Sequence, residues 1–416
     1  MEFVECWKRA LLTLPEDPFF TLMRTYLGSI KTPFHKPTLI NELTAFISKP
    51  ANKKMILDRV ERADAEVLTA LSLLDEPRLS DLSRFYQGSR SFFSLRSHLS
   101  NLEERLLIYL DRSGGSNRIK FNPLIKQDIE KRIISFGLLF PSLPYSGKAA
   151  AFPEPWLTDS LVIAFVSFAQ KREIALTKDG SLRKSFFKEL KETFPVLFSG
   201  PEDERLYVFL KVLLRTDLLT LDKNRYSPNY ISLDKASGLS VEDRTRIYWG
   251  AAGSEELAVE SWAFLYGEFL SALPAKRVFD RKTLESLSRA VAIRAGFNPD
   301  RPEDLLHIAI AMGHVSPLEK DNTFMLSVNP LWFRLTPGKE GVTLLPNFEI
   351  TADKNISLET GIRILSLADI KKHDSVSIFE ITKESVFRGF KKGCTLEELL
   401  SFLKRISKSG DRKSVV

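Results

Sequence analysis

Cysteine and histidine are scarce in this chain, with two cysteines and five histidines among 416 residues. Cys6 and Cys394 lie at opposite ends of the sequence, which excludes a disulfide framework and favours a reducing compartment. His307 and His314 are two helical turns apart, but no cysteine or carboxylate cluster accompanies them. Packing or surface histidines are therefore favoured over metal ligands, and we expect neither a metal nor another cofactor.

The motifs of common enzymes are also missing. There is no GxxxxGK[ST] phosphate loop, no DExH tetrad and no GxSxG nucleophile elbow. Asp369, Glu380 and Lys383 could be drawn as a nuclease site, but acid–lysine neighbours arise by chance in any charged chain. We therefore expect a protein that is not an enzyme and has no small-molecule substrate.

Long apolar runs are absent as well. No segment approaches the ~20 apolar residues that span a bilayer, and the first residues lack the pattern of a signal peptide. We expect a cytoplasmic protein without a membrane partner. A hydrophobic content of 44% and a charged content of 27% are ordinary globular values, and the net charge of +7 permits contact with nucleic acid without requiring it.

A chain of this length exceeds one hydrophobic core, and its pattern predicts a mostly α protein with small β elements. Composition predicts linkers in three segments, Tyr145–Pro155, Leu233–Ser254 and Asn329–Gly341. We expect tandem winged-helix-like domains followed by a small C-terminal α/β module. The predicted segments are a helical N-terminal segment (1–54), a winged helix (55–144), two winged-helix-like domains (156–235 and 255–330) and the module (342–416).

The segment 55–144 has the clearest pattern. Helical stripes of apolar residues start near Ala65, after Pro77 and after Gly88, and two strands follow, RLLIYL and RIKFNPL. Three helices and then a β-hairpin is the order of a winged helix, a relative of the helix-turn-helix DNA binders. We expect the N-terminal segment 1–54 to pack on this block.

The third helix of this block would face DNA with Arg96 as nearly its only charge. Helices that read base sequence usually carry several Arg, Lys, Asn or Gln residues, so docking to protein is favoured over base-specific reading. The hairpin is better placed for phosphate contact. The candidate DNA-binding residues of the block are Arg96, Arg112, Arg118 and Lys120.

The segments 156–235 and 255–330 repeat the succession of helices and a strand or hairpin. A basic amphipathic helix after the Asp179-Gly180 turn contributes Lys184 and Lys188 as further candidates for DNA contact. A solvated outer face is the favoured interpretation of these lysines, and contact with a nucleic-acid backbone is the alternative.

The C-terminal module shows a strand–helix–strand–helix–helix (βαβαα) pattern. Residues 343–351 have strand character with Phe348 facing the core, and Ser357 is the expected cap of the helix that follows. A second, buried strand is predicted at 376–381. Gly393 ends the next helix, and Thr395 with Glu398 forms a capping box for the last one.

This order, with LLPNFEI, IFEITKESV and GCTLEELLSFLKRIS, resembles the "helicase conserved C-terminal" domain. That domain occurs at the N-terminal end of repair helicases of the xeroderma pigmentosum group B type and at the end of separate bacterial proteins. A similar fold on a winged-helix subunit of eukaryotic transcription and repair factor H docks on the helicase and regulates it.

The resemblance implies a bacterial, non-enzymatic accessory subunit in DNA repair that binds and positions or stimulates a group B-type superfamily 2 helicase. Duplex or forked DNA would be contacted through the winged helices. The alternative is a free-standing winged-helix DNA-binding protein or regulator. Phe348, Phe379 and Phe390 are expected in the core of the module. The candidate partner-binding residues that flank it are Asn347, Glu349, Lys383, Arg388 and Lys391.

Overall fold

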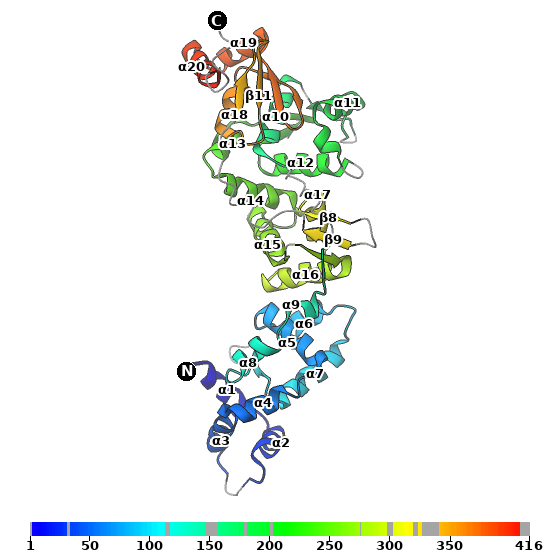
Figure 1. Ribbon diagram of the computed structural model, residues 1–416, viewed down its shortest axis with the longest axis vertical. Coiled ribbons are helices and arrows are strands. Elements are labelled where there is room, and N and C mark those ends of the chain that lie inside the picture. Colours follow the sequence, from blue (N-terminus) through cyan, green and yellow to red (C-terminus); the bar gives the residue numbers. More distant parts are fainter. Residues whose placement is uncertain are drawn as a thin grey trace. The chain divides into compact units, whose positions relative to one another are not determined.

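The computed structural model describes residues 2–30, 34–112, 117–145, 156–172, 174–178, 181–199, 203–274, 276–297, 303–318, 323–326 and 341–407. The chain is mostly helical with small sheets, which confirms the fold class at that level (Figure 1). It divides into two compact units. Unit 1 comprises Met1–Pro144 and Val278–Glu303, and unit 2 comprises Tyr145–Arg277 and Asp304–Val416.

Unit 1 begins with four helices, α1 (Glu2–Leu12), α2 (Glu16–Leu27), α3 (Lys36–Ser48) and α4 (Pro50–Leu57). They pack on the following block, as expected: α1 contacts strand β1, and the Tyr26 hydroxyl donates to the carbonyl oxygen of Glu104 at 3.2 Å. Trp7 and Phe19 are fully buried by this packing.

The three helices and the hairpin predicted for the next block are all present. They are α5 (Arg62–Leu74), α6 (Leu79–Phe85) and α7 (Phe92–Glu104), followed by β1 (Ile108–Asp111) and β2 (Arg118–Phe121). The strands pair antiparallel, with Ile108 opposite Phe121, and Arg78 forms an additional bridge to Arg118. The Gly114-Gly115 turn lies outside the described residues.

Further helices complete unit 1. Helix α16 (Arg281–Arg294) packs on α5 and α6, although nearly 200 residues separate it from the end of α6 in sequence. The short elements α8 (Lys126–Arg132), α9 (Phe136–Leu139) and β3 (Leu143–Pro144) follow the hairpin. Because α16 belongs to unit 1 and its flanking segments to unit 2, the range 255–330 contributes to both units.

A buried carboxylate fixes α7 against α5. Asp64 is 5% exposed and accepts hydrogen bonds from His98 Nε2 at 2.8 Å, Arg105 Nη1 at 2.7 Å and the Glu61 amide at 2.9 Å. Burial would raise the pKa of Asp64, but these hydrogen bonds lower it overall. The ring of His98 is therefore turned toward the interior of the block, where it donates to this buried carboxylate.

Unit 2 starts with α10 (Asp159–Lys171), β4 (Ile174–Ala175), α11 (Lys184–Thr193), the 3₁₀ turn Pro195–Phe198 and α12 (Glu204–Arg215). The hairpin β5 (Leu219–Asp222) and β6 (Arg225–Pro228) closes a three-stranded sheet in the order β4-β6-β5. The predicted helices are confirmed here, whereas the Asp179-Gly180 turn lies outside the described residues.

The predicted linker at Leu233–Ser254 is wrong, because this stretch forms helices α13 (Tyr230–Ser237) and α14 (Val241–Ala252). Ser240 caps α14, and Trp249 is buried against Tyr266 of α15 (Val259–Ala272). Parts of the other two expected linkers, residues 146–155 and 329–340, lie outside the described residues. The remaining elements before the C-terminal module are β7 (Arg277–Asp280), α17 (Glu303–Ala311), β8 (Val315–Pro317) and β9 (Thr323–Leu326).

The C-terminal module has the order ββαββαα, so the predicted βαβαα order is wrong. The expected strand 343–351 is a hairpin, because Phe348 adopts a φ of 63° in the turn after Pro346. The strand Asp369–His373 was missed because its residues are mostly polar. The elements are β10 (Val342–Leu344), β11 (Glu349–Ala352), α18 (Leu358–Leu365), β12 (Asp369–His373), β13 (Ser377–Glu380), α19 (Lys383–Lys391) and α20 (Leu396–Ser407), with sheet order β10-β11-β13-β12.

Helix α10 is the core of unit 2, since every residue from Ser160 to Ala169 is buried. It contacts β6 on one side and α18 and β12 of the C-terminal module on another. Ser167 Oγ accepts a hydrogen bond from the Ile370 amide at 2.8 Å. A Cβ atom at Gly361 would lie 2.5 Å from Ile163 Cγ1, so only glycine permits this approach of α18. The module is therefore built onto α10.

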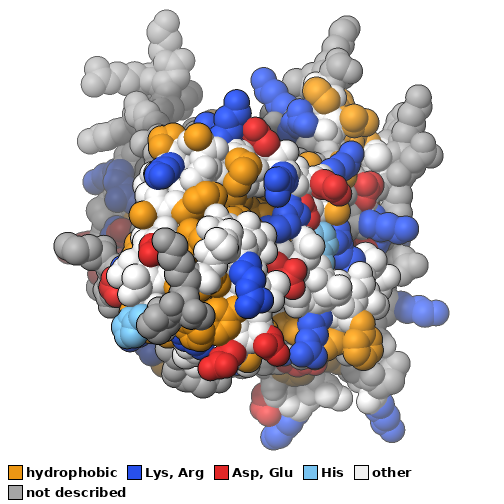
Figure 2. All heavy atoms as spheres, turned by 90° about the horizontal axis from the view of Figure 1, so that it is seen from below, with side chains coloured by type: hydrophobic (Ala, Val, Ile, Leu, Met, Phe, Trp, Pro, Cys, Tyr) orange, Lys and Arg blue, Asp and Glu red, His pale blue; other side chains and the backbone are white. Residues whose placement is uncertain are grey.

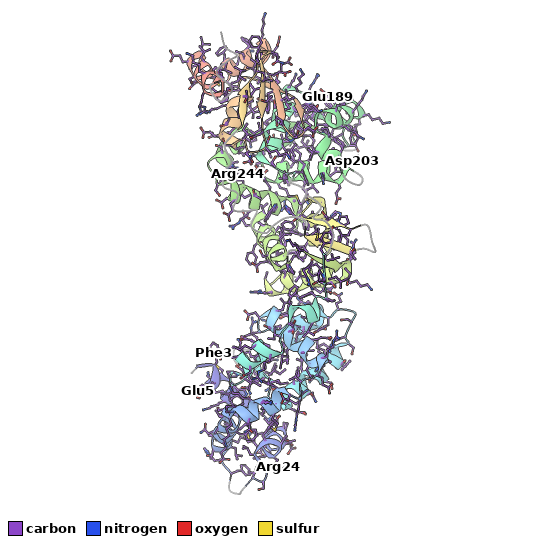
Figure 3. All side chains as sticks on the ribbon, in the orientation of Figure 1. Phe3, Glu5, Arg24, Glu189, Asp203 and Arg244 are labelled. Atoms are coloured by element: carbon purple, nitrogen blue, oxygen red, sulfur yellow. The ribbon has the colours of Figure 1, made fainter. Side chains whose placement is uncertain are left out.

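A buried ion pair holds the first turn of α10. Asp159 accepts from Arg244 of α14 through Nη2 at 2.6 Å and Nε at 3.0 Å, and from the Tyr248 hydroxyl at 3.0 Å. The side chains of Asp159 and Arg244 are 9% and 5% exposed. Figure 3 labels the position of Arg244 in unit 2. Removing one partner of such a pair leaves an uncompensated buried charge.

We expect Arg244→Met to lower the free energy of unfolding of unit 2 by about 3 kcal/mol or more, because Asp159 loses its counter-charge. Urea denaturation followed by tryptophan fluorescence measures the change. Arg246→Met is the matched control, since Arg246 on the same helix forms an exposed pair with Glu242 and should cost about 0.5 kcal/mol. Equal losses for the two variants would contradict a structural role for the buried pair.

Candidate nucleic-acid interface and docking surface

Basic side chains do not form a single patch on the face of the described residues that Figure 2 shows. On the face shown in Figure 2, Lys and Arg side chains are dispersed among hydrophobic and acidic ones. The net charge of +7 therefore does not single out a binding surface by itself. Local clusters of basic side chains beside a hollow are better candidates for a nucleic-acid site.

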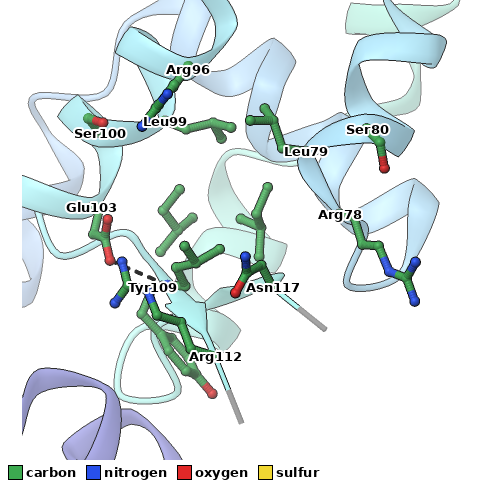
Figure 4. Close-up of a pocket in the computed structure, with 13 residues that line it drawn as sticks. Arg78, Leu79, Ser80, Arg96, Leu99, Ser100, Glu103, Tyr109, Arg112 and Asn117 are labelled. Atoms are coloured by element: carbon green, nitrogen blue, oxygen red, sulfur yellow. Dashed lines mark hydrogen bonds between the residues drawn. The ribbon is translucent and has the colours of Figure 1, made fainter. Parts of the chain in front are cut away.

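One such hollow in unit 1 lies between α7 and the β1–β2 hairpin and has a volume of about 570 Å³. Figure 4 shows Arg96, Ser100 and Glu103 along α7 on one side of it, and Arg112 and Asn117 on the hairpin. Its base is apolar, formed by Leu79, Leu99 and Ile119 among others. Glu103 is the acidic residue of this hollow, and its Oε1 accepts from the Leu110 amide at 3.4 Å.

A second hollow of about 340 Å³ shares Arg78 with the first. It lies where β2, the start of α6 and the end of α16 meet, and Asp75 and Asp81 also line it. Asp81 Oδ2 accepts from the Arg78 amide at 2.9 Å and so caps α6. The two hollows together are lined by six exposed arginines, here named the arginine track: Arg78, Arg84, Arg96, Arg112, Arg118 and Arg294.

Several part-buried cations of unit 1, such as Arg90 and Arg105, pair with carboxylates. The arginines of the track have no carboxylate partner among the described residues. Among the described residues, none of the six forms a salt bridge with Asp or Glu. The Arg118 guanidinium donates to the Glu76 carbonyl oxygen at 3.0 Å, which orients it without neutralising it. Exposed guanidiniums without counter-charges are typical of surfaces that bind phosphate groups.

Three of the four DNA-contact candidates predicted in this block, Arg96, Arg112 and Arg118, belong to the track. Lys120 does not, because its ammonium group forms ion pairs with Glu76 at 3.1 Å and Asp111 at 3.2 Å. Burial would lower the pKa of Lys120, but its hydrogen bonds to Glu76 and Asp111 raise it above the ordinary value. This lysine is paired within the hairpin region, and its contact with DNA stays a prediction.

Sequence reasoning missed Arg78, Arg84 and Arg294. Arg78 stands before α6 and pairs with β2 through its backbone, which places it between the two hollows. A local signal was available for Arg78 and Arg84, since Arg78 directly precedes the second helix and Arg84 lies in its last turn. Arg294 comes from the end of α16, and no local pattern connects it with this block.

Lys184 and Lys188 are exposed on α11, as expected. They belong to unit 2, whereas the track belongs to unit 1. The third helix of their own block, α12, packs on α14 and buries Leu206, Val208 and Val212 in addition to its inner face. Helix α12 is thus buried over more of its surface than α7, whose residues 92–94, 96, 97, 100 and 101 are exposed.

The five partner-binding candidates of the C-terminal module lie in different settings. Asn347 is exposed in the β10–β11 turn, and Lys383 is exposed at the start of α19. Glu349 is engaged with Lys371 at 2.6 Å across the sheet. The Arg388 guanidinium pairs with Asp369, which is 3% exposed. The positive charge of Arg388 therefore compensates a buried carboxylate of the module. Lys391 Nζ lies 4.7 Å from the ring centroid of Phe387.

Large apolar side chains are exposed on the last two helices of the module. Of the three phenylalanines expected in its core, Phe379 is buried, but Phe348 and Phe390 are 66% and 41% exposed, so this expectation is wrong for both. Phe348 is turned out by its positive φ. The exposed apolar residues of α19 and α20 are Phe387, Phe390, Leu396 and Leu400.

The buried His373 joins the module to α10. Its Nδ1 lies 2.7 Å from Ser377 Oγ, which in turn lies 3.0 Å from Ser160 Oγ on α10. Burial lowers the pKa of His373 from 6.5 to about 4. The unfolded chain therefore binds one proton more than the folded chain between pH 4 and 6.5. Stability is full above pH 6.5 and declines as the pH falls toward 4.

We expect unit 2 to lose about 2 kcal/mol of stability between pH 7 and pH 5 through His373, because the neutral ring must stay neutral to remain buried. Urea denaturation at the two pH values measures this loss. His373→Gln should reduce the difference by that amount, whereas His35→Gln, an exposed histidine of unit 1, should leave it unchanged. An identical pH dependence in wild type and His373→Gln would refute the assignment.

The described residues show neither a metal-binding cluster nor a membrane-spanning helix. No group of three or more His, Cys, Asp or Glu residues is arranged to hold a metal ion in the described part of the chain. None of the helices described there is long and apolar enough to cross a membrane. The absence of a cofactor stays a prediction.

Comparison with known proteins gives one partial match. Residues 1–48 match the model of the family TP_0021_N, which is described as an N-terminal domain. The matched segment corresponds to α1, α2 and α3 of unit 1 and includes neither the arginine track nor the C-terminal module. No curated protein matches the chain.

Proposed function

We propose that this protein is a non-enzymatic accessory subunit that docks on a group B-type DNA repair helicase through its C-terminal module. In this proposal, docking positions or stimulates the helicase, and unit 1 contacts DNA. The proposal starts from the resemblance of the module to helicase-associated domains. The observation that carries it further is the set of exposed apolar residues on α19 and α20.

These apolar residues favour a protein partner for the module. Phe387 and Leu396 are each 59% exposed, and they lie on consecutive helices of one small module. Exposed large apolar side chains close together on a folded surface are typical of protein interaction sites. Aromatic residues in such a position often dominate the binding energy, and Lys383 and Lys391 would form part of the polar rim.

The attachment of the module to α10 fits a coupling role. Because α18 and β12 pack on α10, the module and the block around α10 share one core. A helicase bound to the module would therefore be held in a defined orientation relative to the rest of unit 2. This rigid connection is what a subunit that positions a motor requires.

We interpret the two blocks with three helices and a hairpin as winged helices. In unit 1 the order is α5, the bridge at Arg78, α6, α7 and the β1–β2 hairpin; in unit 2 it is α10, β4, α11, α12 and the β5–β6 hairpin. The sheet order β4-β6-β5 supports this interpretation. Since α12 is covered by α14, we assign scaffolding to the block in unit 2 and DNA contact to the block in unit 1.

A free-standing winged-helix DNA-binding protein or regulator is the second candidate function. The arginine track favours it, because six unpaired guanidiniums would support binding to nucleic acid without any helicase. The two candidates differ in what the exposed apolar residues of α19 and α20 do. They bind the helicase in the first and have no binding role in the second.

We expect Phe387→Glu combined with Leu400→Glu to abolish co-purification with a group B-type helicase from the same organism, because a charge cannot be buried unpaired in an apolar interface. Wild-type protein should bind the helicase at micromolar concentration or below in an isothermal titration. Both positions are at least 46% exposed, so the variant should fold normally.

The matched control is Phe264→Glu on α15, where the phenylalanine is 56% exposed but lies outside the module. It should bind the helicase as wild type does. If wild-type protein and helicase show no complex at micromolar concentration, helicase docking is refuted and the free-standing function is favoured.

A further inference from the structure

Two phenylalanines are exposed at the start of α7, next to the first arginine-lined hollow. Phe92 is 43% exposed and Phe93 is 80% exposed. Their ring centroids are 6.0 Å apart in an edge-on arrangement, so the two exposed rings contact each other. Exposing two adjacent aromatic side chains is costly in water, which suggests that they bind a ligand.

Phe92 lies on the same face of α7 as Arg96, a member of the arginine track. Phe92 precedes Arg96 by four residues, and residues four apart lie on the same face of a helix. Arg96, Leu99, Ser100 and Glu103 of that face line the first hollow. Helix α7 thus presents aromatic side chains at its start and continues into a hollow with three arginines.

This combination fits single strands better than duplexes. In a duplex the base faces are stacked, so aromatic side chains at a helix start would meet polar base edges or phosphates. The remaining outward residues of α7, among them Ser94, Ser97 and Asn101, provide few of the long polar groups that read base edges. Unstacked bases, in contrast, offer their faces to aromatic rings, and a basic groove follows their backbone.

We propose that unit 1 binds single-stranded nucleic acid, with Phe92 and Phe93 stacking on bases and the arginine track binding the phosphodiester backbone. The site has no sequence preference, because base faces and phosphates are common to all sequences. This inference rests on the nucleic-acid contact assigned to unit 1 above and names its substrate class. DNA and RNA share the recognised groups, so the experiment compares both.

Fluorescence anisotropy with the full-length protein tests the proposal. The labelled probes are a 20-nucleotide oligo(dT), an oligo(U) of the same length and a 20-base-pair duplex, each titrated at several salt concentrations. Wild-type protein should bind the single-stranded probe at least tenfold more tightly than the duplex. Phe93→Ala should weaken single-strand binding about fivefold or more, because a stacked base is lost.

The arginines should give a different signature from the phenylalanine. Replacing Arg78, Arg96 and Arg112 together by Ala should reduce the slope of log K against log salt by about 2, since three phosphate contacts are lost. Phe93→Ala should keep the wild-type slope. The matched controls are Phe264→Ala and Arg246→Ala, exposed residues of unit 2, which should bind both probes as wild type does.

Two results would overturn the inference. One is duplex binding as tight as or tighter than single-strand binding. The other is an unchanged single-strand affinity in Phe93→Ala, whose exposed position allows the variant to fold. Tighter binding of oligo(U) than of oligo(dT), or the reverse, identifies RNA or DNA as the natural strand. Co-purification with the helicase is unaffected by Phe93→Ala, so a failure here is distinct from a failure of helicase docking.

Discussion

The burial of α10 from Ser160 to Ala169 is the constraint on which unit 2 depends. Residues buried in this way need partners on every side, and α10 obtains them from β6, from the C-terminal module and, at Asp159, from Arg244 of α14. Its polar groups are paired in the same way, Asp159 with Arg244 and Ser167 with the Ile370 amide. The module is consequently part of a shared core, which makes it a fixed platform for a partner.

Unit 1 uses its charges in two distinct ways. Inside the block, cations are paired: Arg105 with Asp64, Arg90 with Glu66, and Lys120 with Glu76 and Asp111. These pairs fix α7 and the hairpin relative to α5. The arginine track lies on the surface that these pairs position, and its members lack described carboxylate partners. Unit 1 thus combines paired cations with six exposed arginines that form no described salt bridge.

Local signals in the sequence were sufficient for many helices. Ser357 caps α18 through the Thr360 amide, and Thr395 with Glu398 forms the predicted capping box of α20, with hydrogen bonds of 2.9 and 3.2 Å. Such caps involve residues three apart and can be recognised without tertiary information. The apolar stripes of α5, α6 and α7 were recognisable for the same reason.

The features missed from sequence depend on distant contacts. Strand β12 consists of mostly polar residues and becomes a strand because β13 pairs with it and α10 covers it. Helix α14 was predicted as a linker, but its residues Arg244 and Trp249 are buried in the core of unit 2. Arg294 joins the arginine track only because α16 returns to α5 and α6. Of the candidate site, Arg96, Arg112 and Arg118 could be predicted, while the hollows that unite them could not.

Hydrogen–deuterium exchange on the full-length protein tests the central claim, which assigns nucleic acid to unit 1 and the helicase to the C-terminal module. Exchange is compared for free protein, protein with oligo(dT) and protein with helicase. The account predicts that oligo(dT) protects amides around residues 78–112, and that the helicase protects amides within 383–400. Protection of the module by oligo(dT), or of 78–112 by the helicase in the absence of nucleic acid, would contradict this division of roles.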